Sequence, residues 1–85
     1  MRGAGPVQWG NETIYCYFMT DVVVTRVRFS ADEADRLDVV EGLRVRLALS
    51  GAEPTDALVV RVRREPPFVW IELTPLAPSA ASRAG

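Results

Sequence analysis

The sequence predicts an all-β fold, a small antiparallel β-barrel of five or six strands. The first observation is an alternation of apolar and polar residues that recurs three times between residues 43 and 73. Successive side chains of a strand point to opposite faces, so each run can bury one face and expose the other. The second observation is the spacing of the strands, because short runs rich in β-branched residues are separated by turn residues.

The length of 85 residues fits one domain. Residues 1–10 hold three glycines and a proline, and we expect a flexible N-terminal entry in which Val7 and Trp9 can pair as a short edge strand. The barrel is expected over residues 11–76. Residues 77–85 are mostly Pro, Ala and Ser, which is typical of a flexible tail.

Five full strands are expected at residues 13–19, 22–29, 43–49, 57–64 and 68–74. In the first, the alternation leaves open whether the face of Cys16 or the face of Tyr17 is buried. In the fourth, Leu58, Val60 and Val62 are expected on the apolar side, opposite Val59 and the arginines.

A short helical turn is expected near residues 31–37. Ser30 and Glu33 form a capping-box pattern, in which the serine hydroxyl accepts a hydrogen bond from the amide three residues later. Acidic residues in the first turn also suit the helix dipole.

The composition argues against catalysis. The net charge is −1, every cation is an arginine, and no histidine is present, which removes the usual general base and imidazole metal ligand. We therefore expect no enzyme activity, no cofactor and no metal. The single cysteine, Cys16, fits a packed strand residue in a reducing interior such as the cytoplasm. No apolar run approaches the roughly 20 residues that span a bilayer, so we expect no membrane insertion.

Between about Asp21 and Leu76 the order of elements resembles the bacterial PilZ domain. The matching pieces are Arg-Phe-Ser at residues 28–30, Gly-x-x-Val-x-Leu at 42–47, Val-x-Arg-Val-x-Arg at 59–64 and Val-Trp-Ile-Glu-Leu at 69–73. The resemblance implies a six-stranded barrel of a family known as receptors for cyclic di-GMP.

The ligand motifs of that family are largely missing. The upstream Arg-x-x-x-Arg element has no counterpart, since Arg2 is the only arginine before Arg26. In the Asp/Asn-x-Ser-x-x-Gly element Asp21 remains, but Val23 and Arg26 replace Ser and Gly. The resemblance thus implies a degenerate module that does not hold cyclic di-GMP in the usual way and acts through protein contacts in the control of motility, pili or exopolysaccharide.

Three binding hypotheses follow. In the first, exposed aromatic residues contact a partner protein, because Trp and Tyr bury large areas and keep a polar group. The candidates are Trp70, Trp9, Tyr15 and Tyr17. Packing in the core or at a barrel end is the competing role for each ring.

In the second hypothesis, arginines line one exposed sheet face and bind an anion, either cyclic di-GMP at a non-standard site or single-stranded nucleic acid. The candidates are Arg26, Arg28, Arg44, Arg46, Arg61, Arg63 and Asp21. Pairing of these arginines within the protein is the favoured alternative, and the balanced charge and missing lysines argue against nucleic acid.

The third hypothesis is self-association, which is compatible with the first. Val22, Val24 and Val59 are expected on otherwise polar faces, and an oligomer would cover such surface.

Overall fold

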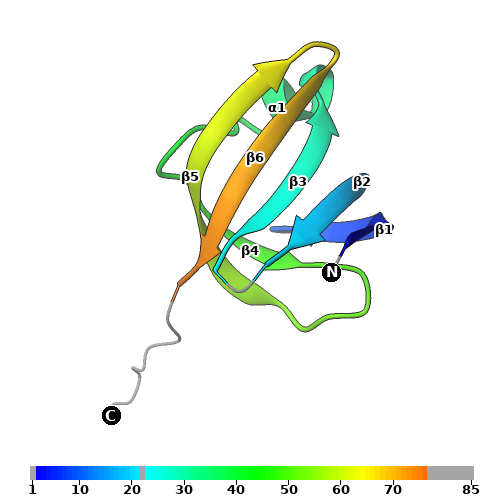
Figure 1. Ribbon diagram of the computed structural model, residues 1–85, viewed down its shortest axis with the longest axis vertical. Coiled ribbons are helices and arrows are strands. Elements are labelled where there is room, and N and C mark those ends of the chain that lie inside the picture. The colour runs from blue at the N-terminus through cyan, green and yellow to red at the C-terminus, as the bar shows by residue number, and fades with distance from the viewer. Residues whose placement is uncertain (1, 22, 77–85) are drawn as a thin grey trace.

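The computed structural model describes residues 2–21 and 23–76, and these form a closed barrel of six antiparallel strands with one short helix (Figure 1). The expected fold class is therefore confirmed. The strands are β1 (Arg2–Trp9), β2 (Glu12–Thr20), β3 (Thr25–Ser30), β4 (Arg44–Ala48), β5 (Thr55–Glu65) and β6 (Phe68–Pro75), and α1 is Ala31–Arg36. Residues 77–85, where a flexible tail was expected, lie outside the described residues, as does Val22.

The strand order around the barrel is β1-β2-β3-β6-β5-β4. The barrel closes where β4 returns to β1, with Gln8 opposite Ala48 and Trp9 opposite Leu47. The last strand of the chain, β6, lies between β3 and β5 and pairs with both. This placement decides which side chains meet on the outer surface.

The expected flexible entry is wrong for residues 2–9, which form strand β1 and pair with β2 from Arg2 opposite Met19 to Trp9 opposite Glu12. The two-residue connection contains Gly10 at a φ of 61°, a conformation that glycine adopts without the strain of a Cβ atom. The glycines therefore mark the tight hairpin and, at Gly3, a place on the inward side of β1 where an added Cβ atom would lie 3.2 Å from the ring of Phe18.

The core lies inside the barrel and under α1. Of the two faces left open for β2, the one with Ile14, Cys16 and Phe18 is buried. The inward alternation of β6 is confirmed, because Val69, Ile71 and Leu73 are fully buried. The remaining buried residues are Val7, Trp9, Val27, Phe29, Ala34, Val39, Leu47, Ala57 and Val59.

The expected facing of β5 is wrong. Val59 is 1% exposed, whereas Val60 is 43% exposed. A bulge between Val59 and Arg61 inserts one extra residue, so the alternation changes phase and Val62 again faces inward. An uninterrupted two-residue pattern cannot reveal such a phase change.

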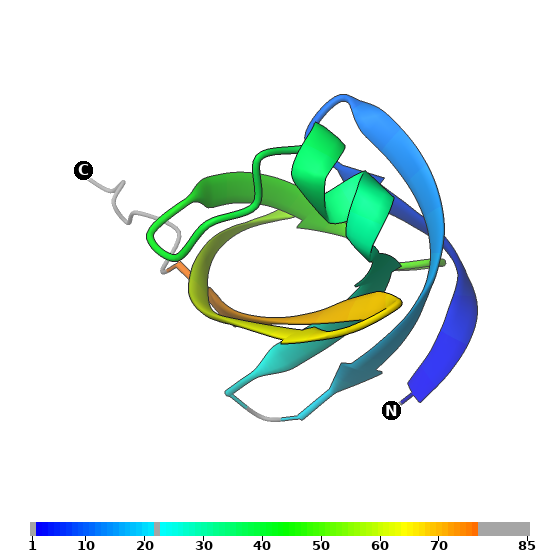
Figure 2. The same cartoon turned by 90° about the horizontal axis from the view of Figure 1, so that it is seen from above.

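The remaining elements differ only at their ends. β3 begins at Thr25, three residues later than expected, and Val23 before it is 64% exposed. The capping pattern is confirmed, because Oγ of Ser30 accepts a hydrogen bond from the Glu33 amide at 3.2 Å. Viewed from the end at which α1 lies, the helix sits at the rim of the barrel (Figure 2), where its buried Ala34 packs on the core.

Candidate functional site

The most distinctive part of the outer surface is a row of side chains across β2, β3 and β6. Tyr17 lies opposite Arg28, and Arg28 lies opposite Trp70. Phe68 is two residues before Trp70 on the same face of β6, so it flanks the row. We call Tyr17, Arg28, Phe68 and Trp70 the Arg28 surface.

The three rings surround one guanidinium. The Cζ atom of Arg28 lies 4.3 Å from the ring centroid of Phe68, 5.4 Å from that of Tyr17 and 5.7 Å from that of Trp70. These distances are within the range of cation–π attraction. Tyr17 and Trp70 also meet edge to face with centroids 5.9 Å apart, so the rings hold the guanidinium in place and support one another.

The charge of Arg28 has no carboxylate partner among the residues the structure describes, whereas four other arginines of the strands have one. Arg26 pairs with Glu72 at 3.1 Å and Arg46 with Asp56 at 3.6 Å. Arg63 pairs with Glu65 and Arg64 with Asp35. The Arg28 surface is therefore a positive centre within an aromatic patch.

The expected arginine-lined face does not form. Because β6 lies between β3 and β5, Glu72 stands between Arg26 and Arg61. In the next row Trp70 stands between Arg28 and Arg63. The remaining candidates lie apart from this row.

Arg44 and Arg46 lie on β4, beside a cavity of about 240 Å³ that Asp56 also lines. Asp21 lies in the connection from β2 to β3, where its amide donates to the Val24 carbonyl at 2.8 Å. The structure thus separates these candidates from Arg28, and internal ion pairs neutralise part of the set, as the sequence favoured.

The four aromatic candidates differ in position and exposure. Tyr17 and Trp70 are half-buried members of the Arg28 surface, and Tyr15 is 79% exposed beside it. The prediction of Trp9 as a surface contact is wrong, because Trp9 is 4% exposed and packs edge to face on Phe29 with ring centroids 5.0 Å apart. Trp9 ends a strand whose inward positions also include the fully buried Val7, which places its ring in the core.

Sequence reasoning missed Phe68 as a site residue. Phe68 follows Pro66 and Pro67 and begins β6, so the sequence pattern predicts only that it belongs to a strand. The available signal is its spacing of two residues from Trp70, which puts both rings on one face.

A groove of about 480 Å³ adjoins the Arg28 surface. One wall is the first half of β2, including Thr13 and Tyr15, and Arg28 and Phe68 also line it. Ser30 and Glu33, at the start of α1, line it as well. The groove lies where the pairing of β2 with β3 stops at Tyr17 and Arg28, while the last residues of β3 pair with β6 alone and lead into the helix.

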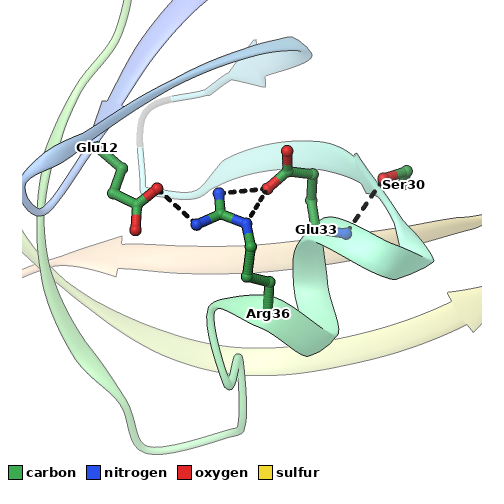
Figure 3. A network of polar contacts seen from close by, with 4 residues as sticks. All are labelled: Glu12, Ser30, Glu33 and Arg36. Atoms are coloured by element: carbon green, nitrogen blue, oxygen red, sulfur yellow. Dashed lines mark hydrogen bonds and ion pairs between the residues drawn. The ribbon is translucent and has the colours of Figure 1, made fainter.

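An ion-pair network links the two sides of this region (Figure 3). Arg36 of α1 donates to Glu12 at 2.7 Å and to Glu33 at 3.1 and 2.6 Å. The hydrogen bonds that Glu33 and Glu12 accept from Arg36 raise the pKa of Arg36 above its usual value. The network links the helix to the start of β2 and leaves Glu33 ion-paired within the chain.

The thiol of Cys16 points inward, and burial raises its pKa to about 11. A thiol with a raised pKa is a poor nucleophile. Among residues 2–21 and 23–76, no group of three or more potential metal-ligating side chains occurs, and no helix is long and apolar enough to cross a membrane.

Comparisons of the chain with models of known protein families, with curated proteins and with solved structures found no match. The fold and the site define the class: a six-stranded β-barrel that presents an arginine framed by aromatic rings next to an open groove.

Proposed function

We propose that this chain is a non-catalytic binding module that contacts another protein through the Arg28 surface. The observation that carries the proposal is the arrangement of three rings around one guanidinium to which no carboxylate of the described chain is paired. Tyr, Trp and Arg are the residue types that contribute most often to the energy of protein interfaces.

The arrangement favours binding for two physical reasons. The rings restrict the Arg28 side chain, so less conformational entropy is lost when a partner binds. The guanidinium also keeps its hydrogen-bond donors for a partner carboxylate, because no side-chain hydrogen bond or ion pair within the described residues engages them. A partner that brings apolar and acidic groups fits this surface best.

The resemblance to PilZ domains supports a regulatory role for this module in bacterial signalling, in the cytoplasm, with motility, pili or exopolysaccharide as the controlled output. The six-stranded barrel agrees with what that resemblance implies. The missing ligand arginines argue for protein contact rather than standard binding of cyclic di-GMP.

Affinity capture with the tagged full chain tests the proposal. Wild-type protein, Arg28→Gln, Trp70→Ala and the control Arg44→Gln are compared, with captured proteins quantified by mass spectrometry. Arg44 is a matched control because it is exposed, lies outside the aromatic patch and, within the described chain, has no carboxylate partner. We expect a partner that wild type and Arg44→Gln retain and that both other variants lose. The proposal fails if no captured protein depends on Arg28 and Trp70.

A further inference from the structure

The side of β2 that faces β3 is only partly paired. Pairing with β3 extends from Tyr17 to Thr20, while residues 13–16 have no partner on β3, which runs on to Ser30 paired with β6 alone. Within the described part of the chain, the backbone of these residues forms no hydrogen bond on this side. A strand edge that is open in an otherwise closed barrel is a place where another strand can add.

The pairing with β1 shows which backbone groups face the opening. Tyr15 lies opposite Pro6, which has no N–H group, so this pair is of the non-hydrogen-bonded kind. Counting from the hairpin pair of Trp9 and Glu12 leads to the same assignment. The N–H and C=O of Tyr15 therefore point away from β1 and toward the groove.

The groove has room for an extended segment. Its volume of about 480 Å³ runs along Thr13, Tyr15 and Tyr17 and reaches Arg28 and Phe68. An added strand advances by the same rise as β2, about 3.3 Å per residue, so about five residues match this length of β2.

The charges at the groove select the occupant. Glu33 is already ion-paired with Arg36, from which it accepts two hydrogen bonds. Arg28 also lines the groove, and no carboxylate of the described residues pairs with it. Arg28 is thus the charged group of the groove lining that lacks a partner of opposite sign among the described residues, and its complement is a carboxylate.

We propose that an extended acidic segment of a partner protein adds to the open edge of β2, forming main-chain hydrogen bonds with Tyr15 and placing a carboxylate on Arg28. This inference rests on the proposed function and names the chemistry of the partner. Because side chains of an added strand alternate, one set faces Tyr15 and Phe68 and suits apolar residues. The recognised pattern is an acidic residue within a short apolar and polar alternation.

The test begins with a display library of random linear heptapeptides selected on the full chain. We expect enrichment of acidic, alternating sequences, and the most enriched peptide is then synthesised as the probe. A selection that returns no acidic sequence overturns the inference. So does concentration-dependent self-association that buries the Tyr15 amide without peptide, since a second copy would then occupy the edge.

Two substitutions at one position separate backbone from side-chain recognition. Tyr15→Pro removes the N–H that faces the groove and no hydrogen bond to β1, whereas the control Tyr15→Thr removes the ring and keeps the N–H. We expect Tyr15→Pro to weaken peptide binding about tenfold relative to Tyr15→Thr, because it loses one main-chain hydrogen bond and the close packing of the added strand. Equal binding by the two variants overturns strand addition.

Hydrogen exchange on the wild-type chain provides a readout that does not depend on a variant folding. The Tyr15 amide should exchange rapidly in the free protein and slowly with peptide bound, while the Ile14 amide, directed at β1, is protected in both. An unchanged Tyr15 amide overturns strand addition. If Arg28→Gln and Trp70→Ala lose the captured partner but Tyr15→Pro retains it, the proposed function stands and the strand-addition mode fails.

Discussion

The rings of Tyr17 and Trp70 meet edge to face at an interplanar angle of 89°, although their strands are not neighbours. β3 lies between them and contributes Arg28, whose guanidinium is within 5.7 Å of both ring centroids. The contact therefore spans three strands. It makes the Arg28 surface a preformed unit rather than a set of independent side chains.

A double-mutant cycle of Tyr17→Leu and Trp70→Leu should show this coupling directly. We expect a coupling energy of about 0.5–1.5 kcal/mol in the free energy of unfolding, from urea titrations, because edge-to-face pairs contribute beyond their buried area. The control cycle pairs Tyr15→Leu with Trp70→Leu, and its effects should add. Additive effects in both cycles would contradict the preformed unit.

The bulge in β5 makes opposite predictions for two adjacent valines. Val59→Thr places a hydroxyl in the core and should lower the free energy of unfolding by about 1–3 kcal/mol. Val60→Thr changes an exposed side chain and should stay within about 0.5 kcal/mol of wild type. Urea unfolding of both variants measures the two free energies of unfolding. A larger loss for Val60→Thr than for Val59→Thr would contradict the bulge.

The buried thiol of Cys16 predicts a dependence of stability on alkaline pH. Its pKa rises from 9.0 to about 11 on folding, so the neutral thiol is favoured in the native state. The contribution is complete below pH 9.0 and is lost as the pH rises toward about 11. The difference in unfolding free energy between wild type and Cys16→Ala should therefore shrink across this window. A difference that stays constant would contradict the buried thiol.

The same burial predicts slow thiol chemistry. At pH 8 the native chain should react with a disulfide reagent far more slowly than the urea-unfolded chain, because the thiolate is the reactive form. Comparable rates in the two states would place Cys16 at the surface.

The cap of α1 predicts a local loss of stability. Ser30→Ala removes the acceptor for the Glu33 amide and should cost about 1 kcal/mol. Ser50→Ala, at an exposed turn position, is the matched control and should be nearly neutral. Thermal unfolding of both variants provides the comparison, and equal midpoints would show that the cap contributes nothing.

Much of the fold follows from local pattern. The alternation in β2 and β6 identified their positions, and the Ser30 to Glu33 pattern identified the helix start. Two features did not follow: β1, whose glycines and proline are atypical of a strand, and the phase change at Val60. Both depend on pairing with a partner strand, which a single segment of sequence does not encode.

The site was less accessible to sequence reasoning than the fold. Tyr17 and Trp70 were candidates and Arg28 was a candidate of a different hypothesis, but nothing in the sequence joined them. They meet because β6 inserts beside β3, a non-local choice of strand order. That same order separates the arginines that the sequence pattern grouped together.

The two tryptophans permit one direct measurement of the central claim. In a ¹H–¹⁵N spectrum the indole N–H signals of Trp9 and Trp70 report on the core and on the Arg28 surface. On titration with the captured partner protein, we predict that the Trp70 indole and the Arg28 side-chain signals shift while the Trp9 indole does not. Shifts confined to residues around Arg44 and Asp56 on β4 and β5, with Trp70 unchanged, would contradict the claim.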